Sequence, residues 1–251
     1  MIDFLVPADL GTVVSFFLIG FAAFTSFITA AAGIGGGVLL IAVMASLVPP
    51  AILIPLHGVV QIGSNAGRAI LMWRHTNWAV VLPFIGGSLI GATIGGLTVV
   101  QLPPAILNLG LGLFILWSAW TKGVALPSRF ASVATGVFSS FLTMFFGATG
   151  PFVAAMIKRL NLGRMEHVAS HAMAMVAQHG IKVVAFGLLG FSFGPYVGLL
   201  VAMVASGFVG TVIGKRVLMK VNDKLFHRIT AIVLTVLALR LLYQGVMALV
   251  A

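Results

Sequence analysis

Apolar residues run along this chain in long stretches, separated by short polar breaks or by breaks containing glycine and proline. The stretches predict helical segments at about 11–32, 36–48, 51–73, 78–100, 104–121, 129–147, 150–160, 164–190, 194–217 and 224–249. Most of them are long enough to cross about 30 Å of hydrocarbon at roughly 1.5 Å per residue, but 36–48 and 150–160 are not. The pattern therefore predicts an all-α polytopic membrane protein with two short helices.

Each short segment follows a glycine-centred break, Gly33–Gly37 in one case and Gly147–Pro151 in the other. Gly33 and Gly147 lie 114 positions apart. The same offset separates His57 from His171, Asn65 from His179, and Arg68 from Lys182. The order long, short, long, long, long also occurs twice. We therefore predict one transmembrane domain, 1–251, with two repeats of five segments at about 11–121 and 129–249, the second inverted relative to the first.

Composition and charge place these segments in a membrane. Only 7% of residues are charged and 61% are hydrophobic, whereas a soluble domain is nearer a quarter charged. The formal net charge is +10. If every segment crosses, the Lys and Arg residues at the ends of segments fall on alternate loops, at about 74–75, 122–129, 158–164 and 215–224. This predicts that these loops face inward and that both termini lie outside the plasma (inner) membrane. The orientation of the chain in its membrane thus explains the positive net charge. The sequence has no basic stripe that would indicate nucleic-acid binding.

Polar residues gather on one face of each long segment that follows a short one. These residues are His57, Gln61, Asn65 and Arg68 in the first half, and His171, Gln178, His179 and Lys182 in the second. Polar groups at membrane depth are costly, so they are candidates for a functional site. For Arg68 and Lys182 the alternative is that the side chain extends to the nearest membrane interface. The chain has no cysteine and no Asp or Glu at mid-span, so these donors suit an anion better than a cation.

The glycine breaks predict the other part of an anion site. A helix that begins after such a break presents unpaired N–H groups and a partial positive charge. We therefore expect both helix starts to approach one cavity that the polar faces complete. The predicted substrate-binding residues are Gly35, Gly36, Gly37, His57, Gln61, Asn65, Arg68, Thr149, Gly150, His171, Gln178, His179 and Lys182. We expect Gly36→Val to remove binding more than folding, and we expect no cofactor, metal or catalytic residue.

The glycine breaks and the polar faces together resemble the TauE/SafE sulfite-exporter family of membrane transporters. The stretches that carry the resemblance are GIGGG at 33–37, PLHGVVQIGSNAGRAILMWRHTNW at 55–78, TGPFVAAMIKRLNL at 149–162, and ASHAMAMVAQHGIKVVAFGLLGF at 169–191. The resemblance covers most of the chain. It implies export or exchange of small sulfur-containing anions such as sulfite or organosulfonates.

We therefore expect a secondary transporter that exports such an anion by alternating access, with the lipid bilayer and a small anion as partners. No nucleotide-binding motif is present, and a homo-oligomer is left open. The first alternative is a copper or nickel carrier, because His167, His171, Met175 and His179 recur every four residues and could ligate a metal. The second is an intramembrane enzyme. This chain, however, lacks the Gly-x-Ser-x-Gly motif that would expose a serine nucleophile.

Overall fold

The computed structural model describes residues 2–32, 35–99, 103–120, 130–217 and 223–250, and the regular elements within these ranges are all helical. In chain order they are α1 (Ile2–Leu5), α2 (Gly11–Ala32), α3 (Gly36–Leu47), α4 (Pro50–Leu71), the 3-10 turn η1 (Trp73–His75), α5 (Trp78–Val99), α6 (Pro104–Trp120), α7 (Ala131–Phe146), α8 (Gly150–Lys158), α9 (Arg164–Leu188), the 3-10 turn η2 (Gly194–Tyr196), α10 (Val197–Val217) and α11 (Asp223–Val250). The all-α prediction is confirmed. The predicted residues Gly33, Ile34, Lys122, Arg129 and Lys220 lie outside the described residues.

Within the described ranges, three helical stretches are long and apolar enough to cross a membrane, judged by length and composition. They are Gly11–Ala30, Trp78–Val99 and Gly194–Gly214. Their outward faces carry large exposed apolar side chains such as Leu89, Ile90 and Val201. In a soluble protein such a surface would promote aggregation, whereas hydrocarbon covers it without cost. The exposed apolar surface is therefore the one that faces lipid.

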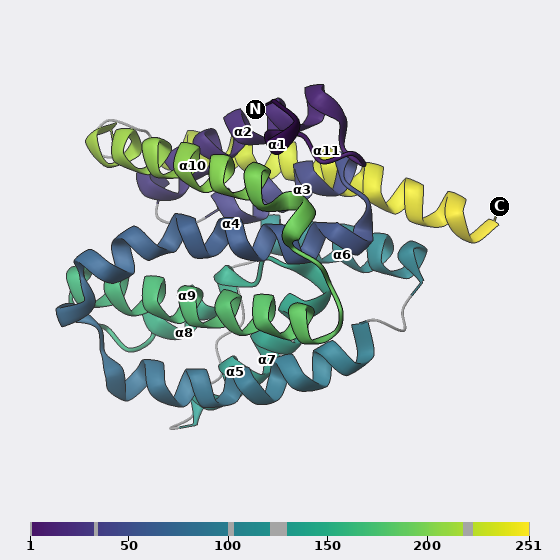
Figure 1. Cartoon of the computed structure of the whole chain (residues 1–251). Coiled ribbons are helices and arrows are strands. Elements are labelled where there is room, and N and C mark those ends of the chain that lie inside the picture. The colour runs from purple at the N-terminus through teal and green to yellow at the C-terminus, as the bar shows by residue number, and fades with distance from the viewer. Residues whose placement is uncertain (1, 33–34, 100–102, 121–129, 218–222, 251) are drawn as a thin grey trace.

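The helices are arranged around a central pair. Helices α4 and α9 pack against each other, with α2 and α10 on one side and α5 and α7 on the other (Figure 1). Helix α10 contacts α4 and α5 contacts α9, so each outer pair reaches the centre. Helices α6 and α11 form a further pair. The short helices α3 and α8 contact α4 and α9 respectively, which places their starts beside the central pair.

The two outer pairs pack closely because glycines line their contacts. A Cβ added at Gly91 of α5 would collide with the Val137 carbonyl oxygen of α7, and one added at Gly210 of α10 would collide with the Ala23 carbonyl oxygen of α2. Small residues at such spacings let helix backbones approach each other in membranes. These seams hold α5 with α7 and α10 with α2 as tight pairs that flank the central helices.

Candidate functional site

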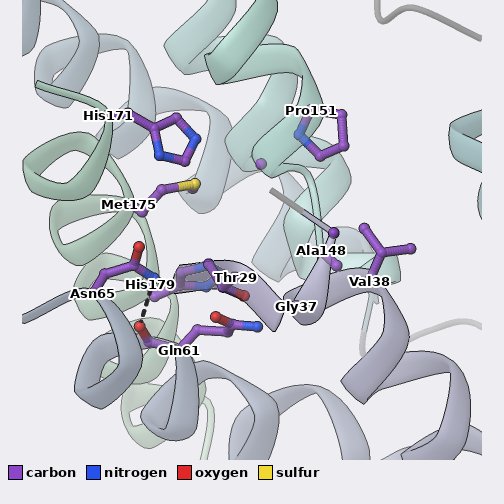
Figure 2. A pocket seen from close by; sticks show the side chains of 12 residues that line it. Thr29, Gly37, Val38, Gln61, Asn65, Ala148, Pro151, His171, Met175 and His179 are labelled. Atoms are coloured by element: carbon purple, nitrogen blue, oxygen red, sulfur yellow. Dashed lines mark hydrogen bonds between the residues drawn. The ribbon is translucent and has the colours of Figure 1, made fainter. Parts of the chain in front are cut away.

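The starts of α3 and α8 meet at one cavity beside the central helices (Figure 2). Its volume is about 50 Å³, and a single water needs roughly 10–15 Å³ on this scale. The cavity thus has room for a few water-sized groups and excludes ligands as large as a nucleotide. Its lining consists of Thr29, Gly35, Gly37, Val38, Gln61, Asn65, Ala148, Gly150, Pro151, His171, Met175 and His179.

The start of α3 presents backbone N–H groups to this cavity. Gly35 precedes the helix with φ +106°, a conformation that glycine adopts without strain, and no side chain caps this end. The first N–H groups of a helix have no acceptor within the helix. Because Gly35, Gly37 and Val38 line the cavity, this helix end directs its free donors and its partial positive charge there.

Gly36 faces away from the cavity. A Cβ at this position would collide with the Thr25 carbonyl oxygen and the Thr29 hydroxyl, so the glycine lets α3 pack closely on α2. The expectation that Gly36→Val removes binding more than folding is therefore wrong, because valine would first force two packed helices apart. At Gly37, by contrast, an added Cβ would meet the Gln61 amide nitrogen.

The start of α8 reaches the cavity with different residues. Gly147, with φ +73°, turns the chain at the end of α7. Thr149 holds the N-cap position of α8, but its hydroxyl donates to the Ser139 carbonyl oxygen at 3.1 Å and leaves the helix end uncapped. Pro151 occupies the first turn, where no N–H is needed. Gly150 and Pro151 both line the cavity, so a second uncapped helix end faces it.

Helix α4 contributes a short chain of hydrogen-bonded polar groups. The Nε2 atom of His57 lies 3.0 Å from the Gly37 carbonyl oxygen and 3.1 Å from the Gln61 amide nitrogen. The Asn65 amide donates to the Gln61 carbonyl oxygen at 2.8 Å (Figure 2). Gln61 and Asn65 line the cavity, whereas His57 is fully buried outside the lining. His57 therefore ties α4 to the start of α3 and supports the wall that Gln61 forms.

Helix α9 presents His171, Met175 and His179 to the cavity (Figure 2). Nε2 of His171 and Nδ1 of His179 are buried and have no hydrogen-bond partner among the described residues. Gln178 instead points toward α7, where its amide nitrogen donates to the hydroxyls of Ser139 at 2.9 Å and Ser140 at 3.1 Å. The α9 face thus offers two unpaired ring nitrogens beside the cavity, where a ligand could supply the missing partners.

The two cations of the central helices lie just outside the lining. Lys182 is fully buried, and its amine donates to the Gly147 carbonyl oxygen at 3.3 Å. The alternative that Lys182 extends to a membrane interface is wrong, because its amine ends inside the protein. Arg68 is partly exposed and donates to the Asn65 side-chain oxygen at 2.8 Å. Arg68 therefore contacts a residue that lines the cavity, Asn65, and Lys182 contacts a residue that adjoins the lining, Gly147.

The acidic side chains that the structure describes are engaged elsewhere. Asp9 accepts a hydrogen bond from the Tyr196 hydroxyl at 2.6 Å, and Glu166 accepts one from the Asn77 amide at 2.7 Å. Neither Asp9 nor Glu166 lines the cavity. The cavity therefore combines two positive helix ends and neutral donors with no described carboxylate, which is the electrostatic environment of an anion site.

A family model described as Sulfite exporter TauE/SafE matches residues 16–241, nearly the whole chain. The chain belongs to this family. Membership implies a membrane transporter of sulfite or a related anion rather than an enzyme, in agreement with the membrane-length apolar helices. No curated protein and no solved structure matches the chain, so the family match alone carries this assignment.

For this TauE/SafE chain, the structure brings part of the predicted site together. The predicted residues that line the cavity are Gly35, Gly37, Gln61, Asn65, Gly150, His171 and His179. Those outside the lining are Gly36, His57, Arg68, Thr149, Gln178 and Lys182. Sequence reasoning did not name Thr29, Ala148 or Met175 as binding residues, and it included Val38 and Pro151 only within the helix starts that were expected to approach the cavity. The glycine breaks could have indicated three of these residues, because Ala148 and Pro151 lie within a break and Val38 adjoins one. No sequence pattern pointed to Thr29.

The metal-carrier alternative finds little support in this TauE/SafE chain. Among the described residues, no group of three His, Cys, Asp or Glu side chains is placed to hold a metal ion. His167 does not line the cavity that His171, Met175 and His179 share. The repeating His/Met face therefore does not come together as one ligand set, and we do not adopt this alternative.

Proposed function

We propose that the chain is a secondary transporter that exports a small sulfur-containing anion, such as sulfite or an organosulfonate, and binds it in the cavity between α3 and α8. The observation that carries the proposal is that two uncapped helix starts face one cavity. Each start carries about half an elementary positive charge. The start of α3 supplies free N–H donors, and the start of α8 supplies fewer, because Pro151 has no N–H and the N–H of Phe152 bonds to the Thr149 carbonyl oxygen at 3.1 Å. Two such ends at one cavity attract a negative ligand far better than either does alone.

The other cavity residues fit a compact oxyanion. Asn65 supplies an amide close to Arg68, and His171 and His179 supply ring nitrogens that lack partners among the described residues. A sulfite or sulfonate head places three oxygens around one sulfur, so it can accept hydrogen bonds from several walls at once. The volume of about 50 Å³ matches a head of this size and leaves little room for a long substituent.

Inverted repeats at about 11–121 and 129–249 are part of the proposal, and the glycine seams support them. In the seam of α5 with α7, Gly87, Gly91 and Gly95 approach the carbonyl oxygens of Val133, Val137 and Phe141. In the seam of α10 with α2, Ser206, Gly210 and Gly214 approach those of Ile19, Ala23 and Phe27. The offset is 119 positions between the two sets of small residues and 114 between the two sets of carbonyls. Such a match over two separate helix pairs favours a repeat over chance similarity.

A pair of side-chain contacts at the central helices agrees with the same offset. The Ser26 hydroxyl donates to Ser64 at 3.3 Å, which joins α2 to α4. The Gln178 amide donates to the Ser140 hydroxyl at 3.1 Å, which joins α9 to α7. Both members of the second contact lie 114 positions beyond those of the first. Inverted repeats allow each half to adopt the arrangement of the other, which supports alternating access around a shared site.

The proposed transporter lies in the plasma membrane with both termini outside and the basic loops inside. Single cysteines at the two ends of α9 test this orientation, because the native chain has none. Gly163 and Ser192 are both exposed and flank the helix. We expect a membrane-impermeant thiol reagent added to intact cells to label Ser192→Cys and not Gly163→Cys. The reverse pattern would overturn the orientation.

A thermal-shift measurement on purified protein tests the function. We expect sulfite, methanesulfonate and taurine to raise the unfolding temperature more than acetate, and choline to have no effect. A ligand at 100 times its Kd stabilises a protein by about 2.7 kcal/mol. Gln61→Leu should remove the shift because Gln61 lines the cavity, whereas Gln178→Leu, a matched change outside the lining, should lower stability and retain it. A shift that survives Gln61→Leu unchanged would contradict the site.

A further inference from the structure

Lys182 is a buried lysine to which the surrounding helices offer no opposite charge. Its side chain is fully buried, and the hydrogen bond of its amine goes to the Gly147 carbonyl oxygen at 3.3 Å. The main elements packed against α9 are α4, α5, α7, α8 and η1, and none of them contains Asp or Glu. We propose that Lys182 is a proton-binding site and that one proton binds together with each anion. This inference rests on the proposed anion site.

Burial without a counter-charge determines the state of the amine. A charged group in a low-dielectric interior is strongly disfavoured unless an opposite charge or several hydrogen bonds surround it. One carbonyl oxygen does not meet that need, so the amine is neutral while the cavity is empty and donates one N–H to Gly147. When an anion occupies the cavity, the Nζ lone pair of Lys182 takes a proton from water and the resulting ammonium is stabilised by the nearby negative charge. Anion and proton then strengthen each other's binding by the same factor.

The amine lies close enough to the cavity for this coupling. Gly147, which accepts its hydrogen bond, is followed directly by Ala148, which lines the cavity. His179, about one helical turn before Lys182, lines it as well. The amine is therefore hydrogen-bonded to a residue that directly adjoins the lining of the cavity. Charges this close interact strongly in the interior of a protein.

Two histidines face the same region and compete for the proton. The rings of His57 and His179 lie 6.0 Å apart, edge to face, and a Cβ added at Gly147 would lie 3.3 Å from Nδ1 of His57. Helices α5 and α7 contribute no titratable side chain. The other titratable groups on α9 and on the elements packed against it are Arg68, Arg74, His75, Lys158, Arg164, Glu166, His167 and His171. The proton goes to Lys182 because an alkyl amine is intrinsically a far stronger base than an imidazole.

Proton binding at Lys182 has a consequence for the driving force. A monovalent anion that crosses with its proton moves no net charge. The membrane potential then does not drive its export, and the direction follows the concentration gradients of the anion and the proton. This deepens the proposed function by naming the second ligand of the site.

Proton uptake on anion binding tests the proposal directly. The probe is methanesulfonate, whose own charge does not change near neutral pH. We expect the purified full-length protein, weakly buffered at mildly alkaline pH with an indicator dye, to take up one proton for each anion bound. In the same range the measured affinity should fall by about tenfold for each unit of pH increase, because binding must then draw a proton from a more dilute supply.

Three variants assign the proton to Lys182. Lys182→Arg carries a permanent charge, so it should bind methanesulfonate without proton uptake and without pH dependence. Lys182→Met removes the charge and should bind roughly ten- to a hundred-fold more weakly, also without proton uptake. Arg68→Gln is the matched control at the same offset in the first half, and it should retain proton uptake because its native group does not titrate in this range.

Each outcome separates the two proposals. Methanesulfonate binding by wild type without proton uptake would overturn the role of Lys182 and leave the anion site standing. Proton uptake that persists in Lys182→Arg, or in Lys182→Met if the arginine variant does not fold, would assign the proton to another group and overturn the inference. An absence of binding to wild type by any sulfonate or by sulfite would overturn the anion site and this inference together.

Discussion

Arg68 and Lys182 hold places 114 positions apart on the two central helices, yet their surroundings differ. Arg68 is partly exposed and bonds to the Asn65 side chain within its own helix. Lys182 is fully buried and bonds to the Gly147 backbone at the end of another helix. A guanidinium stays charged in either setting, whereas an amine can lose its proton. The two central helices thus carry one permanent charge, at Arg68, and one group, the Lys182 amine, whose charge depends on its environment.

The starts of α3 and α8 differ in the residues that form their caps. The first uses a glycine with φ +106°, and the second uses Thr149 and Pro151 without a positive φ at its cap. Both nevertheless leave an uncapped helix end at the cavity. The two starts thus share the geometry of an uncapped helix end, while their cap conformations and side chains diverge. The predictions below test whether that shared geometry and that divergence are real.

The largest effect is expected from leucine at the glycine seams. Gly91→Leu and Gly210→Leu each place a side chain against a backbone carbonyl oxygen, of Val137 and Ala23 respectively. Overpacking costs about 1–3 kcal/mol, and a clash with the backbone belongs at the upper end. Thermal unfolding of purified protein should show a clear loss of stability for both. Gly86→Leu is the control, because the Cβ position of Gly86 on α5 is open. Sensitivity at one seam alone would break the equivalence of the halves.

The next effect concerns the two cations. Arg68→Gln and Lys182→Gln should each slow anion transport into liposomes by about tenfold or more, equivalent to about 1.4 kcal/mol. The reason is that each removes a positive charge beside a cavity with no described carboxylate. Arg68→Lys keeps the charge of a partly exposed side chain and should transport at close to the wild-type rate. Wild-type transport by both glutamine variants, with folded protein present, would show that neither charge serves the substrate.

A smaller effect separates two neighbouring glycines at the start of α3. Gly37→Ala should weaken anion binding by roughly tenfold, since its methyl group would displace the Gln61 amide that lines the cavity. Gly36→Ala should instead lower stability, because its methyl group would meet the Thr25 carbonyl oxygen. Ligand titration and thermal unfolding, measured on both variants, separate the two losses. Equal losses of anion affinity in the two variants would mean that Gly36 does not face away from the cavity.

The smallest effects are expected at the caps. Thr149→Val removes the hydrogen bond to the Ser139 carbonyl oxygen and should cost about 0.5–1.5 kcal/mol of stability. Gly35→Ala forces a side chain into a positive-φ conformation and should cost about 1 kcal/mol. Denaturant unfolding of both variants compares how much each N-cap residue contributes to stability. No change for Gly35→Ala would mean that this glycine is not required for the turn.

Much of the fold followed from the sequence because membrane helices need long apolar stretches, and the predicted segments lie within a few residues of α2 to α11. The site was harder. Spacings of four and eight residues put Gln61 on one helix face with Asn65, and His171 on one face with His179, and all four residues line the cavity. Gln178 follows Met175 by three positions, and that rotation about the helix axis is enough to turn it toward α7. Thr29 was missed because it comes from a third helix, whose approach no local pattern encodes.

The polar faces of α4 and α9 also bear on how the protein is made. These helices have 22 and 25 residues, long enough to span, yet neither is among the three stretches apolar enough to do so by composition. Left alone in lipid, each would expose its histidines, amides and cation to hydrocarbon. During synthesis α4 leaves the ribosome long before α9, so its polar face has to be sheltered by earlier helices or by the insertion machinery until α9 arrives. The residues that form the cavity thus make the first half of the chain dependent on the second for its place in the membrane.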